Sequence, residues 1–192
     1  MTALRELPWE VQIGSESAAS SSREQLIAGI RGASAAIVLL TDRIDDEVLA
    51  AAGQQLRVVA NVAVGFDNVD IASAKRRGVV VTNTPGVLDE ATADLAFGLL
   101  LATVRRIVEA DSFVRSGESW SWEPQGYLGL DVSADAQLGI VGLGRTGMAM
   151  ARRARAFGMN VVATGRRSTT DEARLLGIEA IDLPALLRTS DV

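Results

Sequence analysis

The chain has 192 residues, of which 48% are hydrophobic and 22% are charged, and its formal net charge is −5. This composition is typical of an ordered globular protein of one or two domains, and the acidic balance provides no basic footprint for nucleic acid. The absence of cysteine excludes a disulfide framework and a thiolate metal site. The longest apolar stretch, 95–104, is about half a membrane span. We therefore expect a cytoplasmic protein without a membrane segment.

In the first part of the chain, short apolar runs alternate with helical patterns. Residues 16–22 are rich in Ser and Ala, a composition typical of a loop. The patterns predict helices at 23–31, 45–52 and 71–77 and strands at 35–40, 56–62 and 79–82. Because helices that alternate with apolar strands build parallel sheets, this part is predicted to form an α/β layer.

Residues 89–116 are predicted to form the longest helix. Acidic residues lie near its start and arginines near its end, an order that complements the helix dipole. Between these charges, residues 95–104 are apolar on every face, so the helix needs cover on most sides. Two interpretations stay open: an ordinary core helix, or a subunit interface in which Leu100 takes part.

The segment 137–147, QLGIVGLGRTG, is the most informative of the chain. An apolar run suited to a buried strand leads into glycines spaced G-x-G-x-x-G, and a helical pattern follows. At such a turn Gly142 permits the bend, Gly144 admits a pyrophosphate, and Gly147 lets helix and strand pack closely. The first N–H groups of the new helix would face the phosphates. The alternative is a plain glycine turn.

The end of the following strand, predicted at 160–164, indicates which nucleotide binds. NAD sites place an acidic residue there to hold the ribose 2′-hydroxyl. This chain has Arg166 and Arg167 instead, and guanidinium groups suit the 2′-phosphate of NADP. Ser168 is predicted to add a hydroxyl contact. NADP is thus favoured over NAD, with a solvated basic loop as the alternative.

The remaining residues complete only half of a dinucleotide fold. A third strand is predicted at 178–181, followed by a helix that Asp182 caps and that has Pro184 in its first turn. Residues 190–192 are interpreted as the start of a fourth strand. A whole dinucleotide fold has two mononucleotide-binding halves, so the sequence predicts an incomplete one.

Three stretches, 62–106, 113–122 and 138–161, resemble the D-isomer-specific 2-hydroxyacid dehydrogenases, close to their glyoxylate/hydroxypyruvate reductase branch. The resemblance implies an α/β protein with a flavodoxin-like substrate lobe at 1–87. It implies a dimerisation helix and the first half of a Rossmann-type NAD(P)-binding lobe at 88–192. Both lobes are expected to be incomplete, because the chain resembles a family member truncated at both ends.

The resemblance also implies roles for individual residues. Val64 and Gly65 match the loop whose main-chain N–H groups hold the substrate carboxylate. Thr92 matches a position near the nicotinamide, and Arg145 and Thr146 match the pair that touches the pyrophosphate. In addition, the helix at 89–116 matches the dimer helix of the family, and Trp120 and Trp122 match a loop that reaches toward the neighbouring subunit.

By this resemblance, the chain is a portion of an NADPH-dependent enzyme that reduces glyoxylate or hydroxypyruvate to the D-2-hydroxy acid. The catalytic Arg, Glu and His of the family match no residue of this chain, so whether the chain is itself an enzyme stays open. One alternative is a non-catalytic module that binds part of a dinucleotide and dimerises. Another is a related phosphoglycerate, D-lactate or phosphite dehydrogenase.

Overall fold

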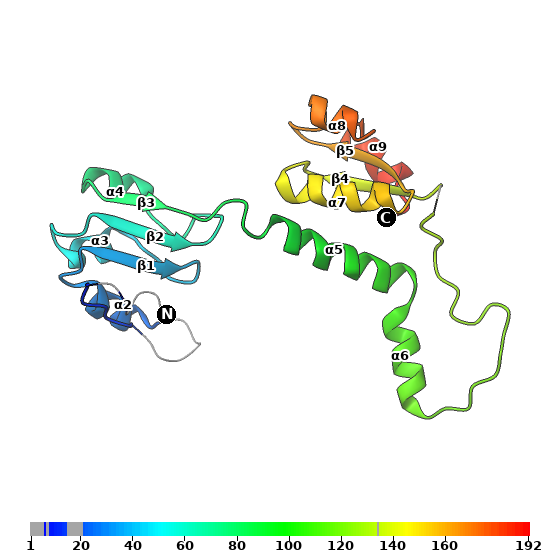
Figure 1. Ribbon diagram of the computed structural model, residues 1–192, viewed down its shortest axis with the longest axis horizontal. Coiled ribbons are helices and arrows are strands. Elements are labelled where there is room, and N and C mark those ends of the chain that lie inside the picture. Colours follow the sequence, from blue (N-terminus) through cyan, green and yellow to red (C-terminus); the bar gives the residue numbers. More distant parts are fainter. Residues whose placement is uncertain (1–5, 7, 15–20, 134) are drawn as a thin grey trace. The chain divides into compact units, whose positions relative to one another are not determined.

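The chain divides into two compact units, Met1–Gly86 and Val87–Val192. A computed structural model describes residue 6 and residues 8–14, 21–133 and 135–192. Most of the loop predicted at 16–22 lies outside the described residues. Each unit has one parallel sheet and its own hydrophobic core (Figure 1). The α/β class predicted from the sequence is confirmed.

Unit 1 contains a three-stranded parallel sheet in the order β1-β2-β3. Its elements are α2 (Arg23–Ile30), β1 (Ala35–Leu39), α3 (Asp46–Ala52), β2 (Val58–Val62), α4 (Ile71–Arg76) and β3 (Val80–Thr82). Each lies within two residues of its predicted bounds. Val38 and Val59 face the buried core on one side of the sheet, whereas Ile37 and Leu39 of β1 face the other side and are exposed.

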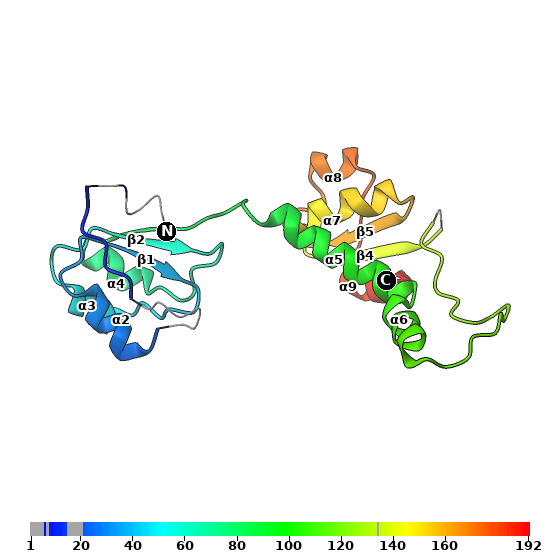
Figure 2. The same ribbon diagram turned by 60° about the horizontal axis from the view of Figure 1, so that its bottom comes forward.

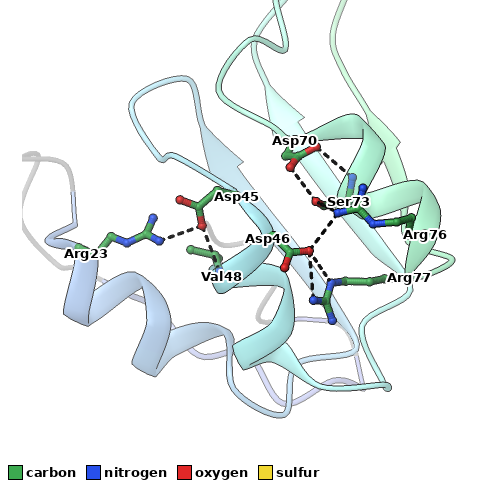
Figure 3. A network of polar contacts seen from close by, with 8 residues as sticks. All are labelled: Arg23, Asp45, Asp46, Val48, Asp70, Ser73, Arg76 and Arg77. Atoms are coloured by element: carbon green, nitrogen blue, oxygen red, sulfur yellow. Dashed lines mark hydrogen bonds and ion pairs between the residues drawn. The ribbon is translucent and has the colours of Figure 1, made fainter.

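Polar side chains fix the starts of the helices in unit 1 (Figure 3). Asp45 caps α3 by accepting a hydrogen bond from the main-chain N–H of Val48 at 3.2 Å, and it also accepts one from Arg23 on α2 at 2.8 Å. Asp70 caps α4 in the same way, by accepting from the N–H of Ser73 at 2.9 Å. The Arg23 guanidinium holds the pKa of the Asp45 carboxyl below its usual value.

Unit 2 contains a second parallel sheet, in the order β4-β5-β6. Its elements from here on are β4 (Gln137–Val141), α7 (Arg145–Ala156), β5 (Asn160–Thr164), α8 (Asp171–Leu175), β6 (Glu179–Ala180) and α9 (Leu183–Thr189). As predicted, Asp182 caps α9.

The last residues of the chain pair with the free edge of β4. The N–H of Asp191 donates to the carbonyl of Gln137 at 2.9 Å, and the N–H of Gly139 donates to the carbonyl of Val192 at 2.8 Å. These bonds start a fourth strand on the side of β4 opposite to β5. The strand arrangement is that of the first half of a Rossmann sheet extended by its next strand.

The single long helix predicted at 89–116 is wrong. The structure has two helices, α5 (Asp89–Val104) and α6 (Ile107–Ser116), and the chain changes direction between them (Figure 1). In a continuous helix the Val104 carbonyl would accept from residue 108. Here it accepts from the N–H of Leu130 at 2.8 Å, and Arg106 takes a left-handed conformation with φ 53°. The returning segment thus replaces the next helical bond.

One face of α5 packs on the core of unit 2, beside α7 (Figure 2). Phe97 and Leu100 are buried in that core, while Leu95 is 66% exposed and Leu99 is 60% exposed. The expected cover on most sides is therefore absent within the described part of this chain. No helix in that part is long and apolar enough to cross a membrane.

Candidate functional site

The glycine turn between β4 and α7 has the geometry that its spacing predicts. Gly142 has φ 95°, a conformation that favours glycine. A Cβ on Gly147 would collide with the carbonyl oxygen of Gly142, so only glycine allows helix and strand to approach this closely. A Cβ on Gly144 would meet nothing within 4 Å, so open space lies above the turn.

The N-terminus of α7 presents unpaired donors to this open space. Gly144 is the N-cap residue and supplies no side-chain cap. The first bond to its carbonyl comes from the N–H of Met148 at 2.9 Å. Within the described residues, the N–H groups of Arg145, Thr146 and Gly147 have no acceptor. Free donors at a helix N-terminus, beside a space that a side chain would fill, fit a bound pyrophosphate.

An ion pair joins the start of α5 to the start of α7. The Arg145 guanidinium lies 3.0 Å from the carboxylate of Asp89, which is mostly buried. Thr92 lies three residues further along α5 and is exposed. Because residues three apart are neighbours on a helix surface, Thr92 lies beside Asp89, the partner of Arg145. The structure thus brings Thr92 and Arg145 to one end of unit 2.

The turn after β5 lies directly against the glycine turn. A Cβ on Gly165, which has φ 124°, would lie 3.5 Å from the Cα of Gly142. Arg166 is exposed, and no carboxylate in the described residues pairs with it. The Arg167 guanidinium lies 3.2 Å from Glu172. Ser168 is buried, and its hydroxyl donates to the Gly165 carbonyl at 2.8 Å, so this side chain holds the turn from within.

In unit 1, the loop that follows β2 offers a second set of main-chain donors. The carbonyl of Val64 accepts from the Asn83 amide at 2.8 Å, and that of Gly65 accepts from the Asn61 amide at 2.9 Å. The N–H groups of Val64 and Gly65 have no acceptor among the described residues. A Cβ on Gly65 would meet nothing within 4 Å. Such a loop can receive an anion.

Sequence reasoning missed Asn61 as part of this loop's support. The signal was present, because an asparagine stands at an inward position of the apolar strand VVANV. A buried polar residue is more informative than an exposed one. In the described part of the chain, no cluster of His, Cys, Asp and Glu has the geometry of a metal site.

A family model described as D-isomer specific 2-hydroxyacid dehydrogenase, catalytic domain, matches residues 3–186. The chain belongs to this family. The glyoxylate reductase of Thermococcus kodakarensis is 51% identical over 174 residues, which cover 88% of this chain and 51% of that protein. The glyoxylate reductase of Thermococcus litoralis is 48% identical with nearly the same coverage. The chain thus spans about half the length of the curated relatives it matches.

Solved structures of this dehydrogenase fold superpose well on the chain. The TT0316 protein of Thermus thermophilus is 44% identical with a TM-score of 0.81, over 88% of this chain and 52% of that one. The D-lactate dehydrogenase of Aquifex aeolicus, complexed with NAD and lactic acid, is 26% identical with a TM-score of 0.74, over 86% and 48%. An acyclic imino acid reductase complexed with NADPH is 28% identical with the same TM-score, over 88% and 52%. The family is therefore NAD(P)-dependent, and either nucleotide occurs among its members.

Proposed function

We propose that this chain is a portion of an NADPH-dependent 2-hydroxyacid dehydrogenase that reduces a small 2-keto acid, glyoxylate or hydroxypyruvate, to the D-2-hydroxy acid. In this proposal NADPH supplies the hydride. The chain's own residues bind two anions: the loop at Val64 and Gly65 receives the substrate carboxylate, and the turn at 142–147 receives the pyrophosphate. The names of the relatives at about half identity support glyoxylate as the substrate.

The preference for NADPH depends on one observation. At the end of β5, where an NAD site needs a carboxylate, the chain has Arg166, which is exposed and pairs with no carboxylate among the described residues, and the preceding Gly165 lies against the glycine turn. Arg167 follows it, already paired with Glu172. A phosphate on the ribose would attract both guanidinium groups, whereas an unmodified ribose hydroxyl would not. Ser168 contributes by holding the turn after β5 through its hydrogen bond to the Gly165 carbonyl, and Arg145 and Thr146 are assigned to the pyrophosphate.

Titration calorimetry of the 192-residue chain with NADPH and with NADH tests this preference. We expect the double variant Arg166→Ala with Arg167→Ala to bind NADPH at least tenfold more weakly, since a hydrogen bond to a charged group contributes about 1.5–3 kcal/mol. NADH binding should hardly change. Arg188→Ala, an exposed arginine on α9, is the matched control. An equal loss for both nucleotides would show that these arginines do not bind the 2′-phosphate.

We also propose that α5 and α6 form a homodimer interface. Besides Leu95 and Leu99, the exposed apolar side chains there include Val108 and Val114 on α6. Trp120 and Trp122, in the connection that follows, are exposed as well. Apolar surface gathered on consecutive elements is typical of a protein–protein contact.

Analytical ultracentrifugation tests the dimer. Leu95→Glu with Leu99→Glu should give folded monomers, because two charges replace exposed apolar contacts. Leu175→Glu, at a still more exposed leucine on α8, is the control and should remain dimeric. Leu100, which the sequence suggested for this interface, packs in the core of unit 2, so a charge there would unfold the unit instead. A wild-type monomer would contradict the proposal.

A further inference from the structure

Asn61 is a buried polar group at the end of the central strand of unit 1, and the proposed function gives it no role. Its side chain is 1% exposed and belongs to the inward-facing side of β2. A buried amide stays in an apolar layer only where its donors and acceptors are satisfied. Its hydrogen-bond partners therefore indicate what it does.

Both hydrogens of the Asn61 amide are used. The side chains of Asn61 and Asn68 form a reciprocal pair, in which each amide nitrogen donates to the other's oxygen at 3.1 Å. The second hydrogen of Asn61 goes to the carbonyl of Gly65 at 2.9 Å. Asn61 thus links the loop that carries Gly65 to a second asparagine.

Asn68 fixes this pair to the neighbouring strand. Its amide nitrogen also lies 3.1 Å from the carbonyls of Leu39, the last residue of β1, and of Asp42 in the turn that follows, so its two hydrogens are shared among three acceptors. Its own main-chain carbonyl accepts from the N–H of Ile44 at 2.8 Å. Asn68 is therefore held at two points outside the loop, and it holds Asn61 in turn.

A third asparagine acts from the other neighbouring strand. Asn83, directly after β3, donates to the carbonyl of Val64 at 2.8 Å. The N–H of Thr84 donates to the carbonyl of Ala63 at 2.9 Å. The carbonyls of residues 63–65 are thus all bound, from the ends of β2 and β3.

This arrangement determines where the loop's N–H groups point. In a planar trans peptide, the carbonyl of one residue and the N–H of the next point in opposite directions. Binding the carbonyls of Ala63 and Val64 therefore turns the N–H groups of Val64 and Gly65 the other way. The bound carbonyl of Gly65 does the same for the N–H of Phe66.

We infer that Asn61, Asn68 and Asn83, together the asparagine cluster, are positioning residues for the carboxylate of the 2-keto acid. Asn83 fixes the peptide group that carries the N–H of Gly65, and Asn61, held by Asn68, fixes the carbonyl side of Gly65, before the substrate arrives. Donors that are already oriented need no reorganisation on binding, so the anion is held more tightly. The inference rests on the proposed function, since that proposal makes the loop a carboxylate site.

Nuclear magnetic resonance of the ¹⁵N-labelled 192-residue chain tests the cluster. Sodium glyoxylate is titrated at constant ionic strength, with sodium chloride as the balancing salt. In the wild type, the amide signals of Val64 and Gly65 should shift and saturate. Asn83→Ala should weaken glyoxylate binding about three- to tenfold, the effect of one hydrogen bond. Asn68→Asp, nearly isosteric but unable to donate, should weaken it more.

Asn160→Ala is the control, because this exposed asparagine lies in unit 2. The signals of β1 and β2 report whether unit 1 keeps its fold in each variant. Loss of glyoxylate binding with those signals unchanged upholds the inference, since a merely structural role would alter them. If Asn68→Asp unfolds the unit, the result for Asn83→Ala decides.

Two outcomes overturn the inference in different ways. If wild-type Val64 and Gly65 do not respond to glyoxylate, the loop is no carboxylate site, and the substrate part of the proposed function fails with the inference. If they respond, and the folded Asn83→Ala and Asn68→Asp variants bind glyoxylate as the wild type does, the proposed function stands and the cluster has no positioning role.

Discussion

The two units present main-chain N–H groups at the same place in their folds, beyond the carboxyl ends of parallel strands, but by different means. In unit 2, the turn at 142–147 is shaped by glycines, and the N-terminus of α7 provides the donors. In unit 1, the loop at 63–67 is not followed directly by a helix, and asparagine side chains bind its carbonyls from behind. One site depends on side chains being absent, and the other depends on side chains being present.

This difference determines how each site fails. The glycine turn is disrupted when a side chain fills the space that two backbones need, which is a steric effect. The asparagine-supported loop is disrupted when a donor is lost and buried acceptors go unpaired, which is a hydrogen-bonding effect. Substitutions chosen for each effect should therefore act in one unit and leave the other unchanged.

The largest expected effect is that of Gly147→Val in unit 2. Its Cβ would collide with the Gly142 carbonyl, and backbone cannot move aside as a flexible side chain does. Overpacking of this kind should lower the free energy of unfolding of unit 2 by about 3 kcal/mol, the upper part of the usual range. Denaturant-dependent hydrogen exchange should show faster opening of β4 and β5, with β1 and β2 unaffected.

Gly144→Ala is the matched control for Gly147→Val. Its Cβ meets open space and its φ is −75°, so stability should stay within about 0.5 kcal/mol of the wild type. Nucleotide binding should nevertheless fall, because the methyl group occupies the space assigned to the pyrophosphate. Equal destabilisation by the two substitutions would refute the steric account of the turn.

In unit 1, Asn61→Leu is expected to lower the free energy of unfolding by about 2 kcal/mol, since it leaves the side-chain oxygen of Asn68 and the carbonyl of Gly65 without the donor that Asn61 provides. Leucine has nearly the same shape, so the loss comes from hydrogen bonding and not from a cavity. Hydrogen exchange should now accelerate in β1 and β2 alone. Wild-type exchange in unit 1 would mean that the amide pair contributes nothing to stability.

The glycine turn could be predicted from the sequence, whereas the support of the unit 1 loop could not. The spacing of Gly142, Gly144 and Gly147 predicts the turn directly, because each glycine meets a requirement of the local backbone. The support of the unit 1 loop depends on asparagines in β2, in the connection that follows it and after β3, and only the folded sheet brings these three side chains together. Val64 and Gly65 were therefore assigned by resemblance, and Asn61 was not assigned at all.

The same limit explains the wrong prediction of one helix at 89–116. The local pattern is helical throughout, and nothing at Arg105 or Arg106 ends a helix by propensity. The break comes from Leu130, more than twenty residues later, which takes the Val104 carbonyl. Sequence patterns therefore predict local helix preference well, but they do not predict a hydrogen bond from a distant residue that ends the helix.

Gly129→Ala tests the same steric effect at the break between α5 and α6. We expect it to lower the free energy of unfolding of unit 2 by about 1 kcal/mol, the lower end of the overpacking range. Its Cβ would collide with the Val104 carbonyl, so the returning segment should move away and release that carbonyl to the N–H of Val108. Slower amide exchange at Val108 is the measurement. Gly126→Ala is the control, since its Cβ meets its neighbours at an ordinary 3.5 Å. Equal exchange at Val108 in both variants would exclude this role for Gly129.

The smallest expected effect is a dependence of unit 1 stability on pH. Asp45 and Asp46 have pKa values lowered in the folded state, Asp45 chiefly by Arg23 and Asp46 chiefly by Arg77 (Figure 3). A carboxyl with a lowered folded pKa stabilises the fold above its unfolded pKa of about 3.9, and this stability is lost as pH falls through the folded pKa. The free energy of unfolding of unit 1 should therefore be constant from neutral pH to about pH 5 and should fall below pH 4.

Arg23→Met sharpens this expectation, because it removes the main cause of the Asp45 shift while retaining most of the side chain's length. The variant should be slightly less stable at neutral pH and lose less stability on acidification. Arg115→Met, which removes only an exposed pair with Asp111 on α6, should leave the pH dependence of unit 1 unchanged. The measurement is hydrogen exchange in β1 and β2 between pH 3 and 7, corrected for the intrinsic exchange rate at each pH. An identical acid profile for Arg23→Met and the wild type would mean that the Arg23–Asp45 pair does not couple protonation to the fold of unit 1.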